Sequence, residues 1–396
     1  MRIAIVASNQ GLVGGVETYL TWLIEALVQR GHAVAFGFER ASTDPESAVG
    51  HAVEPLVRWD LQGLSNSAFM EQVAAFRPDV VFLHALENEA LDIALTKRFR
   101  AVLFAHAFYA ACATGWRVQR IPQRRVCSRR FGPACLAINY LRGCGSRNPV
   151  PLLQLYSKQR ARTQVLRGLA GLVVASEYMR SVYIQHGVPD REVHVIPPPA
   201  SFPPDPAPPA ARESRSQVLL LGRLTSGKGG VTAVRAAALA QRELGRPLQL
   251  TVAGDGPELA RCKALANELG ISTEFTGWVG PERRLAVLRN SDVLLVPSRW
   301  PEPFGIVGIE AASLGVPAVA YPVGGMVDWL RPGESGELAQ STGFDPGALG
   351  HALARALGDP SHYRALQLGA WRMAHEFSGE RHLSKLEALF DQVSRT

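Results

Sequence analysis

The chain begins with a short apolar strand, a glycine-rich turn and an amphipathic helix, and the same arrangement starts again after a proline-rich stretch. The first set covers a strand at 3–7 and a helix at 16–28. The second covers a strand at 218–221, a loop with four glycines at 222–230 and a helix at 231–244. Strands that alternate with helices in this way pack as parallel sheets covered by helices. The sequence therefore predicts two Rossmann-like α/β domains.

Further strands and helices of the same kind are expected in both halves. Strands are predicted at 33–38, 80–83, 102–105, 172–175, 193–196, 248–253, 293–296 and 317–320. Helices are predicted at 87–98, 152–167, 177–186, 304–314, 346–357, 363–377 and 381–393. We expect an N-terminal domain over 1–198, a proline-rich linker over 199–216, a C-terminal domain over 217–375 and a helix over 376–396 that packs back on the N-terminal domain. Two such domains imply a cleft, and open α/β sheets bind ligands at the carboxyl ends of their strands.

The composition is that of an ordinary globular protein and argues for the cytoplasm. Apolar residues make up 47% of the chain and charged residues 19%, which is too little charge for a disordered chain. Five cysteines in 396 residues are too few for a disulfide scaffold. The apolar start at 1–7 is too short for a signal peptide, and no run reaches the roughly 18 apolar residues of a membrane span.

Four of the cysteines fall in one stretch, at Cys112, Cys127, Cys135 and Cys144. Their spacings match no standard zinc pattern, so buried thiols are favoured, although a metal stays open. No Asp-x-Asp pair occurs either. We therefore expect no metal and no cofactor.

The positive charge is concentrated in one segment. Between Ile93 and Ser176 the chain has fifteen Lys and Arg residues and no Asp or Glu. Because the whole chain has a net charge of +7, the remainder is acidic. A basic segment of this kind predicts an anionic partner. Anionic lipid is favoured over nucleic acid, because no nucleic-acid fold or stacking motif accompanies the charge. The alternative is that these arginines lie on several faces and pair with acids elsewhere.

Two glycine-containing loops follow predicted strands. Gly14 and Gly15 precede the first helix, where backbone N–H groups can approach an anion. A simple tight turn is the alternative. The second loop places Arg223 and Lys228 beside glycines, and two cations suit a diphosphate. It is not a Walker A loop, since Gly229 stands where Ser or Thr is needed. Solvated loop cations are the alternative.

A third motif carries two glutamates. Glu302 lies in Pro-Glu-Pro-Phe-Gly ahead of the predicted helix at 304–314, and Glu310 lies within that helix among apolar residues. A buried carboxylate needs hydrogen-bond donors, and ribose hydroxyls would supply them. A salt bridge to an Arg is the alternative for Glu310, and a solvated loop acid is the alternative for Glu302.

Seven motifs in order give the chain a family resemblance. They are GGVE (14–17), SEYM (176–179), GRLTSGKG (222–229), AGDGPE (253–258), FTGWV (275–279), EPFGIVGIEAASLGVPAVA (302–320) and GGMVD (324–328). Together they resemble the retaining glycosyltransferases of family 4, which have the two-Rossmann GT-B fold. The resemblance runs from about residue 1 to residue 390 and is most specific from 218 to 338.

The resemblance implies a role for each matching residue. Arg223 and Lys228 would hold the donor diphosphate and act in catalysis together with Glu302 and His106. The residues implied to bind the nucleotide sugar are Gly14, Gly15, Arg223, Lys228, Gly254, Trp278, Val279, Glu302, Phe304, Gly305, Ile306 and Glu310. Glu310 would bind the ribose, and the backbone near Trp278 would meet the base. His106 follows the strand at 102–105 and would lie beside the donor sugar; a core or surface histidine is the alternative.

Three positions depart from the family pattern, and the first two of them leave the acceptor side open. They are Pro198–Ala200 where Gly-Val-Asp is common, Ala107 where Asp is frequent, and Asp328 where Glu is usual. We expect a retaining glycosyltransferase that moves a sugar from a nucleoside diphosphate sugar to an acceptor hydroxyl. Surface polysaccharide or glycolipid synthesis, peripheral at the inner face of the plasma membrane, is the expected setting. A nucleotide-sugar epimerase and a non-catalytic nucleotide-sugar-binding protein are the alternatives.

Overall fold

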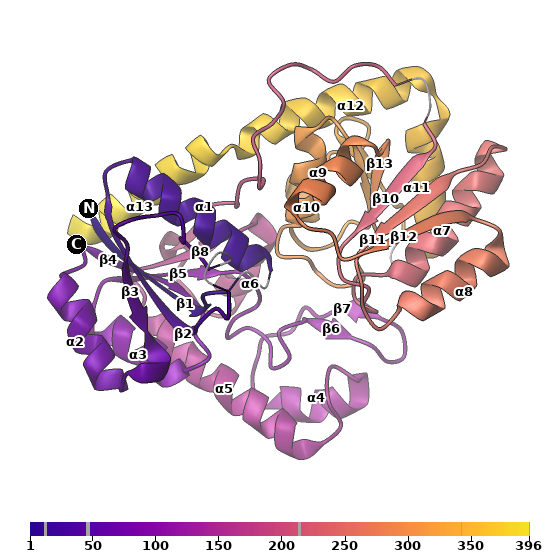
Figure 1. Cartoon of the computed structure of the whole chain (residues 1–396). Coiled ribbons are helices and arrows are strands. Elements are labelled where there is room, and N and C mark those ends of the chain that lie inside the picture. The colour runs from indigo at the N-terminus through magenta and orange to yellow at the C-terminus, as the bar shows by residue number, and fades with distance from the viewer. Residues whose placement is uncertain (12–13, 45–47, 213–214, 342, 396) are drawn as a thin grey trace. The chain divides into compact units, whose positions relative to one another are not determined.

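A computed structural model describes residues 1–11, 14–44, 48–212, 215–341 and 343–395. The chain forms two compact units (Figure 1). Unit 1 comprises Met1–Arg117, Ser128–Ser201 and Glu380–Thr396. Unit 2 comprises Val118–Cys127 and Phe202–Gly379. Each unit is built on its own parallel sheet.

Unit 1 contains a seven-stranded sheet in the order β3-β2-β1-β4-β5-β8-β9. Every neighbouring pair is parallel. The strands are β1 (Arg2–Asn9), β2 (Ala33–Arg40), β3 (Val57–Asp60), β4 (Val80–His84), β5 (Ala101–Ala105), β8 (Gly171–Val174) and β9 (Val193–Val195). Strands β1, β4 and β5 are buried along most of their length, as expected of parallel strands covered on both faces.

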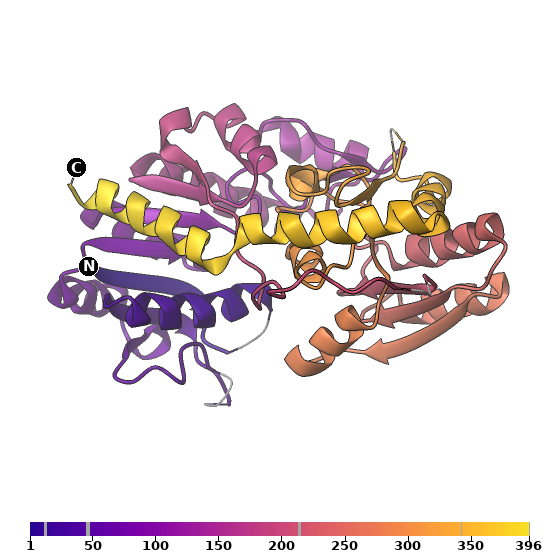
Figure 2. The same cartoon turned by 90° about the horizontal axis from the view of Figure 1, so that it is seen from above.

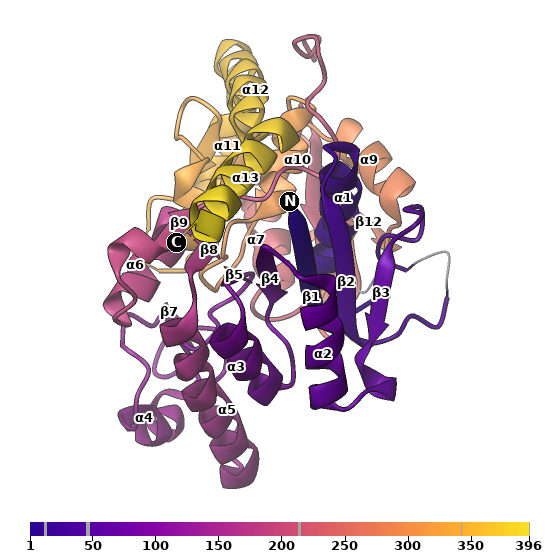
Figure 3. The same ribbon diagram turned by 90° about the vertical axis from the view of Figure 1, so that its left-hand side faces the viewer.

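Helices cover both faces of this sheet. The helices of unit 1 are α1 (Gly15–Gln29), α2 (Asn66–Phe76), α3 (Glu89–Arg98), α4 (Ala134–Arg142), α5 (Pro149–Gly168), α6 (Glu177–Gln185) and α13 (Gly379–Arg395). Helices α1 and α13 lie on one face, and α2, α3 and α5 lie on the other (Figure 3). The chain starts α5 and α6 where Asn148 and Ser176 accept hydrogen bonds from first-turn N–H groups, because such side chains satisfy donors that the helix leaves open.

Unit 2 contains a six-stranded parallel sheet in the order β12-β11-β10-β13-β14-β15. Its strands are β10 (Gln217–Leu221), β11 (Gln249–Ala253), β12 (Ser272–Gly277), β13 (Val293–Val296), β14 (Ala318–Ala320) and β15 (Gly336–Leu338). Its helices are α7 (Gly230–Leu244), α8 (Leu259–Leu269), α9 (Pro281–Arg289), α10 (Ile306–Ser313), α11 (Pro346–Gly358) and α12 (Pro360–Ala374). A single turn, η4 (Gly324–Asp328), follows β14.

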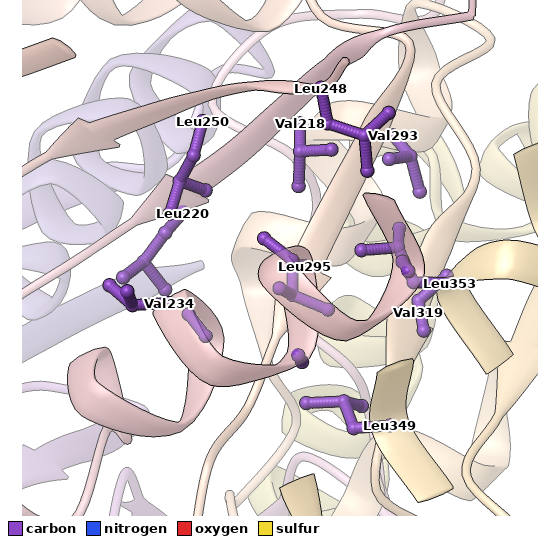
Figure 4. Close-up of a cluster of buried hydrophobic side chains, with 14 of the residues drawn as sticks. Val218, Leu220, Val234, Leu248, Leu250, Val293, Leu295, Val319, Leu349 and Leu353 are labelled. Carbon is purple, nitrogen blue, oxygen red and sulfur yellow. The ribbon is translucent and has the colours of Figure 1, made fainter. Parts of the chain in front are cut away.

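The core of unit 2 lies between the sheet and its helices (Figure 4). Val218, Leu220, Leu250 and Leu295 project from the strands toward α7 and α11. Burial of each such side chain contributes about 1.5 to 3 kcal/mol. The strands therefore end at fixed positions, and the loops that leave them are held in place.

The predicted domain boundaries differ from the structure at two places. We placed Val118–Cys127 in the N-terminal domain, but this segment belongs to unit 2. The proline-rich stretch is no free tether, because Asp205 N–H donates to Ser313 O at 2.9 Å and Trp371 Nε1 donates to Asp205 O at 2.7 Å. From Phe202 onward this stretch is part of unit 2.

The C-terminal helices α12 and α13 follow one another in the chain but belong to different units (Figure 2). In α13 the buried residues include Leu383, Leu386 and Phe390. The Phe390 ring packs edge-on against Phe82 of β4, with centroids 5.1 Å apart. Helix α13 therefore completes the core of unit 1.

Candidate functional site

The loop after β10 carries Arg223 and Lys228 and ends at the first residue of α7. Arg223 is exposed. Lys228 is half-buried, and its Nζ lies 2.7 Å from Glu302 Oε1. Its ammonium also lies 5.6 Å from the centre of the Trp300 ring, within the range of a cation–π contact. Lys228 is thus held in one place by a carboxylate and a ring.

Glu302 is the centre of a hydrogen-bond cluster. Only 5% of its surface is exposed. Besides Lys228, its Oε1 accepts from Ser298 Oγ and from Trp300 Nε1, the latter at 2.8 Å. Glu302 is therefore not a solvated loop acid. A carboxylate with a charged partner and two further hydrogen-bond donors is held in one orientation.

The segment around Glu302 is fixed by the turn η4. Gly325 N–H donates to Glu302 O at 2.8 Å. Gly324 has φ +62°, and a Cβ there would lie 2.2 Å from Glu302 O, so only glycine fits. Trp329 is fully buried, and its Nε1 donates to Phe304 O at 2.7 Å. The carbonyl oxygen of Phe304 therefore already accepts a hydrogen bond within the protein.

Glu310 is fully buried in α10 and forms an ion pair with Arg284 of α9. The salt bridge that we kept as the alternative is thus the arrangement in the structure. Sequence reasoning did not identify Arg284 as the partner. Its Nε is buried, with no hydrogen-bond partner among the described residues.

The other predicted donor residues of unit 2 lie at strand ends or helix starts. Trp278 follows β12 with 79% of its surface exposed, whereas Val279 is buried. Gly305 precedes α10, and Ile306 is its first residue. Gly254 has φ +149°, and a Cβ on it would lie 2.0 Å from Gly222 O. The loop at Gly254 thus passes so close to the loop at Gly222 that packing alone explains the glycine at position 254.

His106 belongs to unit 1, where it lies in a buried cluster. Its Nε2 lies 2.7 Å from His84 Nδ1. Tyr19 OH lies 2.8 Å from His382 Nε2, and the Tyr19 and His106 ring centroids are 5.7 Å apart. Burial, together with the nearby His382, lowers the pKa of His106 to about 3. His106 is therefore a neutral hydrogen-bonding group at neutral pH.

A cavity of about 280 Å³ in unit 1 is bordered by this cluster. Polar side chains in its wall are Ser8, Asn9, Glu17, His84, His106, Tyr109, Gln159 and Arg162. Glu17 is buried, and its Oε1 accepts from Asn9 Nδ2 at 3.1 Å. Gly14 precedes α1 and Gly15 is its first residue. A Cβ on Gly15 would meet no atom within 4 Å, so no packing requirement explains that glycine.

Asp92, which we did not identify from the sequence, lies behind this cavity. It is fully buried, and its Oδ2 accepts from Tyr109 OH at 2.8 Å, while its Oδ1 has no partner among the described residues. Burial raises the pKa of Asp92 to about 7.

We expect Asp92 to make the protein less stable as the pH rises. Because the pKa in the folded state is raised, the stabilisation by the protonated form is complete below the unfolded pKa and is lost as the pH approaches 7. Relative to Asp92→Asn, the wild-type free energy of unfolding should fall by about 2 kcal/mol between about pH 5 and pH 7. Urea unfolding at several pH values measures this difference. The control is Asp391→Asn, at a carboxylate that is half exposed and paired with Arg395, and an equal pH dependence in both variants would contradict the prediction.

The basic segment is less uniformly exposed than we expected. Arg117 is only 2% exposed and donates to the carbonyl oxygens of Ala111 and Arg129. Arg124 is half-buried and donates to Ser226 Oγ at 3.1 Å. These two cations of the basic segment are therefore bonded within the protein. No helix in the described ranges is both long and apolar enough to cross a bilayer.

The cysteines of the basic segment have separate neighbours. Cys112 Sγ lies 3.5 Å from Thr114 Oγ1, and Cys127 Sγ accepts from Gln119 Nε2 at 3.7 Å. Across the described residues, no group of three or more His, Cys, Asp or Glu side chains is arranged to hold a metal ion.

Comparison with known families accounts for both units. Residues 13–201 match Glycosyltransferase Family 4, and residues 202–370 match the glycosyl transferases of group 1. The chain belongs to the family 4 glycosyltransferases. Two sheets of parallel strands in separate α/β domains confirm the GT-B fold class for this glycosyltransferase.

Relatives of this glycosyltransferase match along most of its length. It is 27% identical to the D-inositol 3-phosphate glycosyltransferase of Corynebacterium jeikeium (strain K411), over 99% of this chain and 97% of the relative. It is 29% identical to the Nocardia farcinica (strain IFM 10152) protein of the same name, over 93% and 82%.

Solved structures share its fold at low sequence identity. Anabaena HepE in complex with UDP and glucose matches with a TM-score of 0.70 and 17% identity over the whole of both chains. WaaG, a glycosyltransferase involved in lipopolysaccharide biosynthesis, matches with a TM-score of 0.65 and 17% identity over 98% of each chain.

Proposed function

We propose that this glycosyltransferase transfers a sugar from a nucleoside diphosphate sugar to an acceptor hydroxyl with retention of the anomeric configuration. The observation that carries the proposal is the cluster of Lys228, Glu302 and Trp300 beside the glycine-rich loop that ends β10. The solved complexes of HepE with UDP and with UDP-glucose support a donor of this class.

In this proposal the donor diphosphate binds Arg223 and Lys228 and needs no metal. Lys228 already neutralises Glu302, so the arriving diphosphate would share the ammonium with a carboxylate held rigid by two neutral donors. Positive charge from both residues and from the N-terminus of α7 would stabilise the leaving diphosphate. Charged contacts of this kind contribute about 1.5 to 3 kcal/mol each.

The remaining roles follow the family resemblance. Glu302 and the backbone of Phe304, Gly305 and Ile306 would contact the donor sugar. Since Phe304 O is bonded to Trp329, we assign the sugar contact to backbone N–H groups of this segment. Glu310 would bind the ribose, which requires it to accept hydroxyl donors while it remains paired with Arg284.

Four further residues have roles in the same proposal. Trp278 and Val279 would meet the base, Gly15 would approach the phosphates, and His106 would lie beside the donor sugar as a neutral imidazole. The relatives' name and the lipopolysaccharide neighbours support an acceptor that is a sugar or polyol hydroxyl, in cytoplasmic synthesis of a surface polysaccharide or glycolipid.

The chemical step is a front-face displacement. The bond from the anomeric carbon to the diphosphate oxygen breaks, the acceptor oxygen bonds to the same face, and its proton passes to a donor phosphate oxygen. Double displacement needs a carboxylate on the opposite face of the sugar, and the family resemblance places only His106 there.

We expect the first product to keep the donor's anomeric configuration. A proton NMR time course, started after a screen of nucleoside diphosphate sugars with nucleotide release as the readout, measures it. The inverted anomer as first product would contradict retention. Conversion of the donor without any acceptor would favour an epimerase, and binding without turnover would favour a non-catalytic protein.

We also propose that unit 1 binds anionic lipid through α4 and the start of α5, here called the α4–α5 surface. Leu141 is 70% exposed and Val150 is 59% exposed. Arg142 and Arg147 lie between them in the sequence, and no acid occurs in this part of the chain. Exposed apolar side chains among cations suit an anionic bilayer, to which each cation adds about 1 kcal/mol.

Binding to anionic vesicles should weaken with salt and with loss of the apolar residues. Co-sedimentation with phosphatidylglycerol vesicles should fall at least severalfold for the Leu141→Ser, Val150→Ser double variant. The control is Val327→Ser, which removes an apolar residue 48% exposed in unit 2. Equal sedimentation of both variants, or no preference over neutral vesicles, would contradict lipid binding.

A further inference from the structure

A short hairpin carries cations of the basic segment into unit 2. Strands β6 (Val118–Gln119) and β7 (Arg125–Val126) pair antiparallel (Figure 1). Arg120 and Arg124 are the first and last residues of the loop that connects them. The residues on both sides of the hairpin belong to unit 1, but the hairpin itself belongs to unit 2.

Arg124 lies against the loop that carries Arg223 and Lys228. Its Nη2 donates to Ser226 Oγ at 3.1 Å. Burial, and then the charges of Arg299 and Arg120, lower the pKa of Arg124 to about 10, and Glu258 acts in the opposite direction. Three guanidinium groups therefore lie close to one another near Ser226, with Glu258 as the carboxylate that acts on Arg124.

Two buried polar atoms in or beside this loop have no hydrogen-bond partner among the described residues. Arg299 N–H donates to Gly227 O at 2.7 Å, yet its side-chain Nε is buried and bonds to no described residue. Thr225 Oγ1 is also buried and has no hydrogen-bond partner among the described residues. A buried donor left unsatisfied is costly, and a guanidinium fork matches the oxygens of a phosphate.

We propose that Arg124, with Arg120 and Arg299, forms a binding site for a phosphate group at the tip of the loop that contains Ser226. The proposal rests on the proposed function, because it assigns this group to a substrate of the transfer reaction. It adds a second set of cations to Arg223 and Lys228, supplied by a hairpin inserted in the N-terminal half of the sequence. The phosphate belongs either to the donor diphosphate or to a phosphorylated acceptor.

The test is isothermal titration calorimetry on the full chain with two probes. The first is UDP, and the second is inorganic phosphate in the presence of saturating UDP. Arg124→Gln should raise the Kd of one probe by about 10-fold or more, as expected for a charged contact. A raised Kd for UDP assigns the site to the donor diphosphate. A raised Kd for inorganic phosphate, with the Kd for UDP unchanged, assigns it to a second substrate.

Two matched variants separate binding from support of the loop. Arg125→Gln changes the neighbouring hairpin cation, whose Nε bonds to Gln119 Oε1 at 2.8 Å, and should leave both Kd values unchanged. Ser226→Ala removes the hydrogen bond to Arg124 but keeps its charge, and should change either Kd by less than about threefold.

Three results would overturn the phosphate site. They are unchanged Kd values in Arg124→Gln, a loss of affinity in Arg125→Gln equal to that in Arg124→Gln, and a loss of affinity in Ser226→Ala equal to that in Arg124→Gln. Lys228→Gln is measured alongside. If it weakens UDP and Arg124→Gln weakens neither probe, the hairpin site fails while the proposed donor site stands. If Lys228→Gln leaves UDP binding unchanged, the proposed donor site itself fails.

Discussion

Replacing Arg223 and Lys228 together by alanine should lower kcat/KM for sugar transfer by at least about 100-fold, since each charged contact to a diphosphate is worth about 1.5 to 3 kcal/mol. The loss follows from the position of Lys228, whose Nζ lies 2.7 Å from Glu302 Oε1. Removing it takes away one diphosphate contact and leaves a buried carboxylate with neutral donors only. Initial rates of nucleotide release measure the effect.

Two control variants distinguish a lost diphosphate contact from misfolding. Lys228→Gln keeps a hydrogen-bond donor for Glu302 but removes the positive charge. It should therefore lose most of the kcat/KM that Lys228 contributes, with little change in the free energy of unfolding. Arg235→Ala removes an exposed cation of α7 and should leave kcat/KM unchanged. Wild-type turnover in a cooperatively folded double variant would show that these residues do not hold the donor.

Trp329→Ala should be the most destabilising single change in unit 2, with a loss of about 3 to 5 kcal/mol. The indole is fully buried, packs against Gly308 and donates to Phe304 O. Its removal leaves both a cavity and an unsatisfied carbonyl beneath the segment that carries Glu302. The midpoint of guanidinium-induced unfolding measures the loss.

Trp278→Ala is the matched control, because it removes the same side chain at a position 79% exposed. It should change the unfolding free energy by less than about 0.5 kcal/mol. Equal midpoints for the two variants would mean that Trp329 does not stabilise unit 2.

The main strands could be predicted from the sequence because each is a short apolar run between turn residues. Thus 293–296 is β13 and 102–105 lies within β5. The elements that were missed lack this signal. Strand β12 (Ser272–Gly277) is half polar and has no buried residue, and in α9 (Pro281–Arg289) only Leu288 is buried. Tertiary pairing, not local pattern, forms these elements.

The site was predictable as a set of residues but not as a set of partners. The residue types and surroundings of Lys228 and Glu302 singled out each of them in a separate motif, and the structure brings the two side chains into contact. The pairing of Glu310 with Arg284 depends on how α9 packs beside α10, which no local pattern encodes. For the same reason charge alone could not show that Arg117 is buried beneath carbonyl groups.

The chain passes between the units four times, and its last passage returns α13 to unit 1. The last buried apolar residues that this core receives, among the described residues, are Leu383, Leu386, Leu389, Phe390 and Val393. During synthesis unit 1, which begins first, therefore lacks part of its core until α13 has been translated. Unit 2, whose residues are complete at Gly379, can finish folding before it. Domains ordinarily fold in the order in which they emerge from the ribosome. Here unit 1 begins first, but its core is completed only after the last residue of unit 2 has been added.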